Sequence, residues 1–203
     1  MVTTSMTSTQ KYTPAEYLQR EEQAAIKSEL IQGDIIEMAG ASANHNRIAV
    51  NMCRLLPLDN GNQPYEIFMG DMRLWLPAYS SYTYPDVLAV AATPQFTDEK
   101  QTALINPCLI VEIRSASTAA YDKTDKFQLY RSIPEFEEYV LVDQTAYRVE
   151  QYTKKAVNQW LLTEWIGPDA VFSLQSVGVE ITLVDLYKRV QFEAAAAEQK
   201  DGV

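Results

Sequence analysis

Two strand-like segments, Leu109-Ile110-Val111-Glu112-Ile113-Arg114 and Glu138-Tyr139-Val140-Leu141-Val142-Asp143, decide the fold of this chain. A helical pattern from about residue 121 to residue 132 lies between them. This length suits a crossover that joins two parallel strands. The strand-like segments outside this unit are typical of antiparallel ribbons. We therefore predict an α/β (α+β) fold with a central twisted mixed sheet flanked by helices.

The other expected elements follow from local patterns. Thr13-Pro14-Ala15-Glu16 is a capping box with proline at the first helical position, and it predicts a short helix. Residues 29–38 predict a hairpin that turns at Gly33-Asp34. The remaining predictions are a helix over 44–56, strands over 67–76, 84–91, 147–152, 159–165 and 179–183, and a closing helix over 184–190.

Length and composition indicate an ordinary globular protein. With 203 residues the chain can bury a single core, and we expect one domain over residues 11–192. Residues 1–10 are expected to be a disordered N-terminal tail. Residues 193–203 are expected to be a frayed or disordered C-terminal tail. The N-terminus lacks the pattern of a signal peptide, and no apolar stretch approaches the ~20 residues of a membrane span. Cys53 and Cys108 are therefore expected to be reduced thiols in a cytoplasmic protein.

Several classes of chemistry lack their sequence motifs. The chain contains no G-x-x-x-x-G-K-[ST], no G-x-G-x-x-G and no G-x-S-x-G, which argues against phosphate-loop, dinucleotide-binding and serine-hydrolase functions. With one histidine and two distant cysteines, a zinc site of ordinary composition is not expected. Oxygen ligands remain, and these suit Mg²⁺ or Mn²⁺.

Acidic residues occur in two neighbouring apolar segments. Glu112 shares one face of its strand with Ile110 and Arg114, and Asp86 directly precedes Val87-Leu88-Ala89-Val90. A carboxylate in such surroundings is costly to bury unless it is paired or binds a metal. Two carboxylates that hold a divalent metal, with a cation nearby, can hydrolyse a phosphodiester. The alternative is a structural ion pair near the edge of the sheet.

The candidate cations are Lys126, Lys123 and Arg114. Leu129 and Tyr130 share a helix face with Lys126 and are expected to turn toward the sheet, which places the ammonium within about 4–6 Å of the candidate carboxylates. We expect Lys123 to be solvated or paired with neighbouring acids. Arg114, whose fork suits carboxylates, is expected to be a secondary contact or a salt-bridge partner.

The overall charge argues against general affinity for nucleic acid. The formal net charge is −10, whereas nucleic-acid binding normally depends on a basic surface. Between residues 112 and 131, however, four cations (Arg114, Lys123, Lys126, Arg131) face three anions (Glu112, Asp122, Asp125), which gives +1 locally. The candidate site therefore differs in charge from the rest of the chain.

Eight short motifs occur in a fixed order along the chain. They are Thr13-Pro14-x-Glu16-Tyr17-Leu18, Glu29-Leu30-Ile31-x-Gly33-x-Ile35, His45 at a helix start, Tyr84-Pro85-Asp86-Val87, Pro107-x-Leu109-Ile110-Val111-Glu112-Ile113, Ser115-x-Ser117-Thr118, Asp122-x-x-x-Lys126-x-x-x-Tyr130 and Pro134-Glu135-x-x-Glu138-Tyr139-x-Leu141-Val142-Asp143. In this order they resemble the PD-(D/E)XK, or restriction-endonuclease-like, superfamily. Within it, the chain is similar to a bacterial family of endonucleases of largely uncharacterised function. The resemblance covers about residues 12–190.

The resemblance implies an α-β-β-β-α-β core with Asp86 and Glu112 as ligands of Mg²⁺ or Mn²⁺. It also implies that Lys126 is the site lysine, displaced onto the helix. Arg114 stands where the family usually has an apolar residue, so it either replaces the cation or blocks the metal through a salt bridge. Glu29 is a candidate further acid, with a hairpin surface charge as the alternative.

His45, at a helix start, is expected either to cap the helix or to form a hydrogen bond near the site. Together these features predict a Mg²⁺-dependent DNA endonuclease. A homodimer is expected because cutting two strands requires two sites. Two alternatives stay open: a catalytically inactive nuclease-fold module that binds nucleic acid or protein, and a small-molecule phosphodiesterase.

Overall fold

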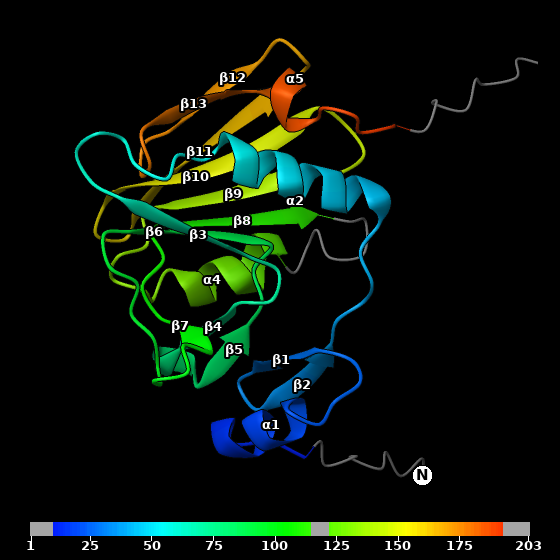
Figure 1. Cartoon of the computed structure of the whole chain (residues 1–203), viewed down its shortest axis with the longest axis vertical. Helices are drawn as coiled ribbons and strands as arrows, with labels where there is room; N and C mark the ends of the chain where they lie inside the picture. The colour runs from blue at the N-terminus through cyan, green and yellow to red at the C-terminus, as the bar shows by residue number, and fades with distance from the viewer. Residues whose placement is uncertain (1–9, 115–121, 193–203) are drawn as a thin grey trace, which may run out of the picture.

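The computed structural model describes residues 10–114 and 122–192, and its strands form three sheets. Figure 1 shows the six-stranded sheet crossing the upper half, with α2 (Ala43–Leu55) packed along it and α4 (Phe127–Tyr130) below. A five-stranded sheet and α1 (Pro14–Glu21) form the lower part. The predictions for residues 1–9 and 193–203 lie outside the described ranges.

The six-stranded sheet contains the predicted parallel connection. Its order is β11-β10-β9-β8-β6-β3, and only β8 and β9 run parallel, with Leu109 opposite Glu138. The strands are β3 (Tyr65–Met69), β6 (Val87–Ala91), β8 (Leu109–Arg114), β9 (Glu138–Asp143), β10 (Arg148–Ala156) and β11 (Gln159–Ile166). The predicted central mixed sheet is therefore confirmed.

Alternation along β8 divides the core into two layers. Val111 and Ile113 face a cluster that includes Ile48 and Met52 of α2, whereas Ile110 faces a cluster that includes Leu129 of α4. Successive side chains of a strand point to opposite faces. Glu112 is thus directed to the face covered by α4 and by the second sheet.

The crossover helix is shorter and less regular than predicted. Within the described residues it consists of a π-helical turn, Asp122–Lys126, followed by α4. A π-helical turn inserts an extra residue into the helical ladder and is frequent at functional sites. The beginning of the predicted helix, at residue 121, and the Ser115-x-Ser117-Thr118 motif lie outside the described ranges.

The five-stranded sheet was not anticipated from the sequence. Its order is β2-β1-β5-β4-β7. The strands are β1 (Ser28–Ile31), β2 (Asp34–Glu37), β4 (Arg73–Leu76), β5 (Ser81–Thr83) and β7 (Ala103–Leu104), with a 3₁₀ turn at Pro77–Tyr79. Tyr17 of α1 packs with Leu30 and Tyr82 in a third core cluster. The expected capping box of Thr13 and Glu16 opens α1.

The prediction of one strand over residues 67–76 is wrong. The chain leaves β3 at Met69, turns at Gly70, where φ is +50°, and enters the other sheet as β4. Alternation of apolar residues continues on both sides of the turn, so the pattern does not reveal the change of sheet. The predicted strand over 84–91 also begins too early, because residues 84–86 connect β5 to β6.

Smaller differences concern turns and ends. The hairpin of β1 and β2 turns at Gln32-Gly33, one residue earlier than predicted, because Ile31 pairs with Asp34. Both turn residues have positive φ, 50° and 91°, as the tight turn that matches strand twist requires. The sequence missed β12 (Val171–Leu174), which pairs with β13 (Val179–Thr182), and α5 is only Leu183–Leu186. No helix in the described parts is long and apolar enough to cross a bilayer.

Candidate active site

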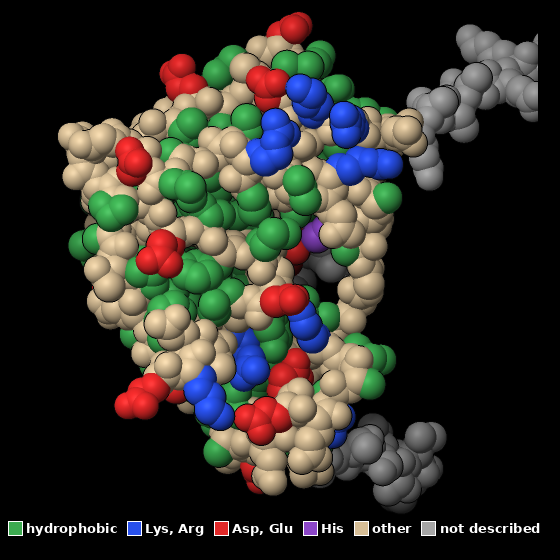
Figure 2. All heavy atoms as spheres, in the orientation of Figure 1, with side chains coloured by type: hydrophobic (Ala, Val, Ile, Leu, Met, Phe, Trp, Pro, Cys, Tyr) green, Lys and Arg blue, Asp and Glu red, His purple; other side chains and the backbone are tan. Residues whose placement is uncertain are grey.

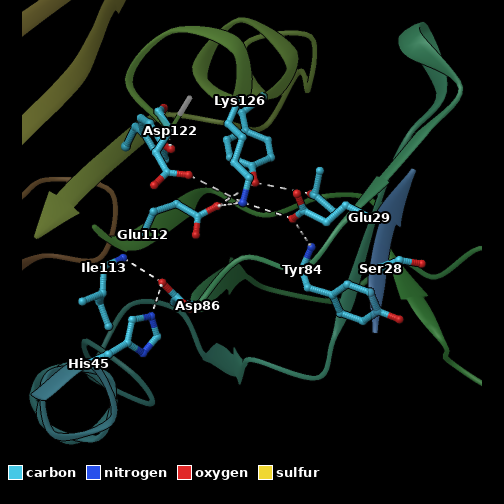
Figure 3. A network of polar contacts seen from close by, with 12 residues as sticks. Ser28, Glu29, His45, Tyr84, Asp86, Glu112, Ile113, Asp122 and Lys126 are labelled. Carbon is cyan, nitrogen blue, oxygen red and sulfur yellow. Dashed lines mark hydrogen bonds and ion pairs between the residues drawn. The ribbon is translucent and has the colours of Figure 1, made fainter. Parts of the chain in front are cut away.

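Lys126 lies at the centre of a buried cluster of acidic side chains (Figure 3). Its Nζ is 3.0 Å from Glu29 Oε1, 3.2 Å from Glu112 Oε1 and 3.7 Å from Asp122 Oδ1. Each acid is only 4% exposed, and Lys126 is 7% exposed. Glu29 comes from β1, Glu112 from β8, and Asp122 and Lys126 from the π-helical turn. The cluster, called the Lys126 cluster below, therefore joins the two large sheets.

The predicted position of Lys126 is found, and the lysine is closer to Glu112 than expected. Asp122 and Lys126 are four residues apart on one helix face. Leu129 and Tyr130 are buried against the sheet, as expected, which carries the lysine stem inward. The Tyr139 hydroxyl donates to the Asp122 carbonyl at 3.0 Å and holds the start of the turn against β9.

Tyr130 has a polar contact that sequence reasoning missed. Its ring packs edge-on against Tyr139 and Phe136, as a core residue would. Its hydroxyl also donates to Glu112 Oε1 at 2.8 Å. The spacing Asp122-x-x-x-Lys126-x-x-x-Tyr130, which sets all three side chains on one face, was the available signal.

The Lys126 cluster holds an excess of negative charge. With all groups ionised, three carboxylates and one ammonium give a net charge of −2. Burial raises the pKa of Glu112 to about 8; Lys126 opposes this rise, and the charges of Asp86, Asp122 and Glu29 add to it. Burial alone would lower the pKa of Lys126, but the neighbouring carboxylates raise it well above its ordinary value. Lys126 thus stays protonated, and a proton or a metal cation would relieve the remaining charge.

Asp86 is held by a backbone amide and by the single histidine. The Ile113 amide donates to Asp86 Oδ2 at 2.7 Å, and His45 Nε2 lies 3.1 Å from the same oxygen. Asp86 directly precedes β6, and Val87 pairs with Val111, so the register continues with Asp86 opposite Glu112. The two acids are therefore neighbours: Glu112 lies in β8, and Asp86 is the residue before β6.

His45 fulfils the second of its two expected roles. Ser42 caps α2, because its hydroxyl accepts from the His45 amide at 3.1 Å. The His45 ring reaches Asp86 from the first turn of α2. Burial would lower the pKa of His45, but the hydrogen bond and the charge of Asp86 outweigh burial and raise it. His45 therefore orients Asp86 by a charge-assisted contact.

Asp86 and Glu112 each use one oxygen and leave the other available. Their contacts go to Asp86 Oδ2 and Glu112 Oε1, and within residues 10–114 and 122–192 no hydrogen bond reaches the second oxygen of either acid. In Figure 3 the second oxygen of Glu112 points away from Lys126, toward the side on which Asp86 lies. This donor pair fits Mg²⁺, which is commonly bound through one or two carboxylates and otherwise by water and substrate oxygens. Across the described residues, no three His, Cys, Asp or Glu side chains form a preformed metal cage.

Arg114 and Lys123 face a different acid. Arg114 Nη2 lies 3.1 Å from Glu150 Oε1, and Lys123 Nζ lies 2.8 Å from Glu150 Oε2. Glu150, on β10, is 2% exposed, and the sequence analysis missed it because it lies two strands away from β8. Arg114 is thus a salt-bridge partner, as expected, although not of Glu112, and Lys123 is paired with an acid.

Comparison with known proteins identifies the family of this chain. The model of the Uma2 family, described as "Putative restriction endonuclease", matches residues 14–184. The chain belongs to the Uma2 family. Two uncharacterised Synechocystis proteins are similar to it. One, sll1609, is 58% identical over 158 residues, which cover 78% of this chain and 89% of that protein. The other, slr1290, is 36% identical over 185 residues, which cover 90% and 94%.

A solved structure shares the fold of this Uma2 protein. It is described as a putative nuclease belonging to DUF820, from Anabaena variabilis. The two structures superpose with a TM-score of 0.68 at 18% identity, over 87% of this chain and 97% of that one. The restriction-endonuclease-like superfamily inferred from the eight motifs, and its fold class, are therefore confirmed.

Proposed function

We propose that this Uma2 protein is a Mg²⁺-dependent endonuclease that hydrolyses phosphodiester bonds of DNA, with Asp86 and Glu112 as metal ligands and Lys126 as the cationic partner. The observation that carries the proposal is the Lys126 cluster, in which buried carboxylates exceed the cations that neutralise them. Such an excess is costly unless a proton or a metal ion compensates it.

Asp86 and Glu112 would hold Mg²⁺ or Mn²⁺ through their second oxygens, because hard cations prefer carboxylate oxygen. A bound divalent ion supplies Lewis-acid stabilisation of the phosphate and a more acidic water. Lys126 and Tyr130 fix the orientation of Glu112, while Ile113 N and His45 fix that of Asp86. The chain thus positions both ligands before substrate arrives.

Lys126 acts electrostatically in this proposal. Its raised pKa keeps the ammonium protonated at neutral pH, so it suits stabilisation of developing negative charge and does not suit general-base catalysis. Glu29 serves the site indirectly, because it holds the ammonium from the side opposite Glu112; the Tyr84 amide anchors Glu29 at 3.1 Å. Arg114, held by Glu150, would add positive charge at the edge of the site.

The test is cleavage of plasmid and single-stranded DNA with Mg²⁺ or Mn²⁺. Glu112→Gln should lower the rate by about 100-fold or more, because the neutral amide lacks the negative charge with which a carboxylate binds Mg²⁺. Glu37→Gln, an exposed acid on β2, is the matched control and should cleave at the wild-type rate. Wild-type rates for Glu112→Gln would contradict the proposal.

Two further variants test whether Lys126 or Arg114 is the cation that catalysis requires. Lys126→Ala should lose most activity, and Arg114→Ala should lose less. If Lys126→Ala keeps full activity while Arg114→Ala is inactive, the two roles are reversed. Calorimetry with Mn²⁺ separates the inactive-module alternative, since a wild-type protein that binds no Mn²⁺ would favour it.

A homodimer in the cytoplasm completes the proposal. Strand β11 is an edge strand of the six-stranded sheet and exposes Leu161 (50%) and Ile166 (68%). An exposed apolar edge strand is a template for pairing with a second chain. Cys53 and Cys108 are both free thiols, as a reducing compartment would have them. Sedimentation equilibrium should show a dimer that Leu161→Lys converts to a monomer.

A further inference from the structure

Four cations gather on one surface of this acidic protein. They are Arg47 and Arg54 of α2 and Lys188 and Arg189, which follow α5. Figure 2 shows Lys and Arg side chains grouped over α2 and the segment after α5. Arg54, Lys188 and Arg189 are exposed, and Arg47 is half-buried. In a chain of net charge −10, such a group, called the α2 patch below, contrasts with the overall composition.

Hydrogen bonds hold the two parts of the α2 patch together. Asn51 Nδ2 donates to the carbonyls of Leu186 and Lys188, at 2.9 Å each. Asn44 Nδ2 donates to the Gln191 carbonyl at 2.7 Å, and the Gln191 amide donates back to Asn44 Oδ1 at 3.1 Å. The backbone that carries Lys188 and Arg189 is therefore fixed against α2.

Within residues 10–114 and 122–192, the cations of the α2 patch have no acidic partner. Among the described residues, every salt bridge involves other side chains. Arg47 and Arg54 instead donate to the side-chain oxygens of Asn44 and Asn51, at 3.0 and 3.4 Å. Four cations on one surface that lack an acidic partner among the described residues repel each other and favour a polyanion.

The α2 patch lies on the same helix as a residue of the candidate active site. His45, which contacts Asp86, is two residues before Arg47. Arg47 and Arg54 are seven residues apart, or about 10 Å along the helix axis at ~1.5 Å per residue. On B-DNA each strand carries a phosphate every ~3.4 Å of axis, so this length corresponds to about three phosphates.

We infer that the α2 patch binds the phosphate backbone of the DNA whose scissile bond lies at the candidate active site. The inference rests on the proposed function, since it assigns the surface that holds the substrate beside the Lys126 cluster. Phosphate contacts position a duplex without reading its sequence. The α2 patch thus explains how a protein of net charge −10 can bind a polyanion. Its cations are concentrated where the DNA backbone would lie.

The test compares two triple variants of the full chain. Arg54→Gln/Lys188→Gln/Arg189→Gln removes three exposed cations of the α2 patch. Arg20→Gln/Lys100→Gln/Lys155→Gln removes three exposed cations elsewhere. Both triple variants have a net charge of −13 instead of −10. Any effect of overall charge on DNA binding is therefore the same in both. Binding of a fluorescent 20-base-pair duplex is measured by anisotropy in EDTA, where no metal-dependent cleavage occurs.

The variant of the α2 patch should bind at least about 10-fold more weakly at low salt than the wild type. The slope of log affinity against log salt should fall by about 2–3, since each lost phosphate contact removes ~0.9. The control triple should keep the wild-type affinity and slope. Equal losses in both triples, or no loss in the first, would overturn the inference. Binding of phosphatidylserine vesicles through the α2 patch, without binding of DNA, would also overturn it.

The same reagents separate this inference from the proposed function. If the wild type binds DNA through the α2 patch but cleaves nothing with Mg²⁺ or Mn²⁺, the proposed nuclease activity fails and the inference stands. If the wild type cleaves DNA and the variant of the α2 patch cleaves and binds as well as the wild type, the inference fails and the activity stands.

Discussion

At the scale of single residues, buried charge governs the candidate site. Lys126 remains charged in the interior because Glu29, Glu112 and Asp122 surround its ammonium. Burial, together with the charges of the neighbouring acids that one cation cannot neutralise, raises the pKa of Glu112. Burying these charged side chains costs free energy, and stability alone would favour apolar residues at their positions. The buried charges therefore indicate a function.

The raised pKa of Glu112 predicts how the stability of the metal-free protein depends on pH. The folded state binds this proton more tightly than the unfolded state, whose pKa is near the ordinary 4.5, whereas the folded pKa is about 8. The contribution of Glu112 to stability is therefore fully present below the unfolded pKa and is lost as pH rises through about 8. Urea denaturation in EDTA should show stability falling from about pH 5 to pH 8 in the wild type and a flatter profile in Glu112→Gln.

Glu37→Gln, on the exposed side of β2, is the control and should follow the wild-type profile. Parallel pH profiles for Glu112→Gln and the wild type would show that Glu112 is already ionised at low pH in the folded protein. That result would remove the buried-charge argument for the site.

At the scale of secondary-structure elements, polar side chains join segments that the sheets alone do not join. Glu138, at the start of β9, is fully buried and accepts hydrogen bonds from the Gln151 side chain and from the Ser176 amide and hydroxyl, at 2.8, 3.0 and 2.6 Å. It also accepts from the Gln175 amide at 3.2 Å. Glu138 thus fastens the turn between β12 and β13 to the six-stranded sheet.

We predict that Glu138→Leu destabilises the protein by about 3 kcal/mol or more, because it leaves several buried donors without an acceptor. Glu137→Leu, the exposed neighbour, should change the free energy of unfolding by at most about 0.5 kcal/mol. Urea denaturation of both variants provides the comparison. Similar small effects at the two positions would mean that the turn finds other partners.

At the scale of the whole molecule, the candidate site exists only where the two large sheets meet. Glu29 belongs to the five-stranded sheet and Glu112 to the six-stranded sheet, and Lys126 contacts both. The proposed metal ligands, Asp86 and Glu112, are far apart in the sequence, so a metal that needs both binds the folded state alone. Binding must therefore stabilise the entire fold.

We predict that Mn²⁺ at about 100 times its Kd stabilises the protein by about 2.7 kcal/mol. For a chain of this size, the melting temperature should rise by roughly 5–10 °C. Asp86→Ala should abolish the rise, whereas Asp125→Ala, an exposed acid on the π-helical turn, should keep it. Differential scanning calorimetry with and without Mn²⁺ measures both. An equal rise in Asp86→Ala would place the metal elsewhere.

Local sequence patterns were sufficient for much of the fold and for part of the site. Periodicity and length identified β8, the crossover and β9, and the spacing of Asp122, Lys126 and Tyr130 set these side chains on one helix face. Alternation along β8 put Glu112 and Ile110 on the same face. These features depend on residues close in the chain, so the geometry of a single strand or helix determines them.

Only the tertiary structure decided which distant residues meet. The turn at Gly70 sends the chain from one sheet to the other, and no change in apolar alternation marks it. The contact of Glu29 with Lys126 depends on how the two sheets pack. The contact of Glu150 with Arg114 depends on the order of β8, β9 and β10 within the six-stranded sheet. A strand's local sequence pattern is often compatible with either sheet. Packing of the whole core therefore decides which strands pair when they are far apart in the sequence. The sequence by itself therefore determined β8, the crossover, β9 and the facing of their side chains. The tertiary packing decided which distant residues meet at the site.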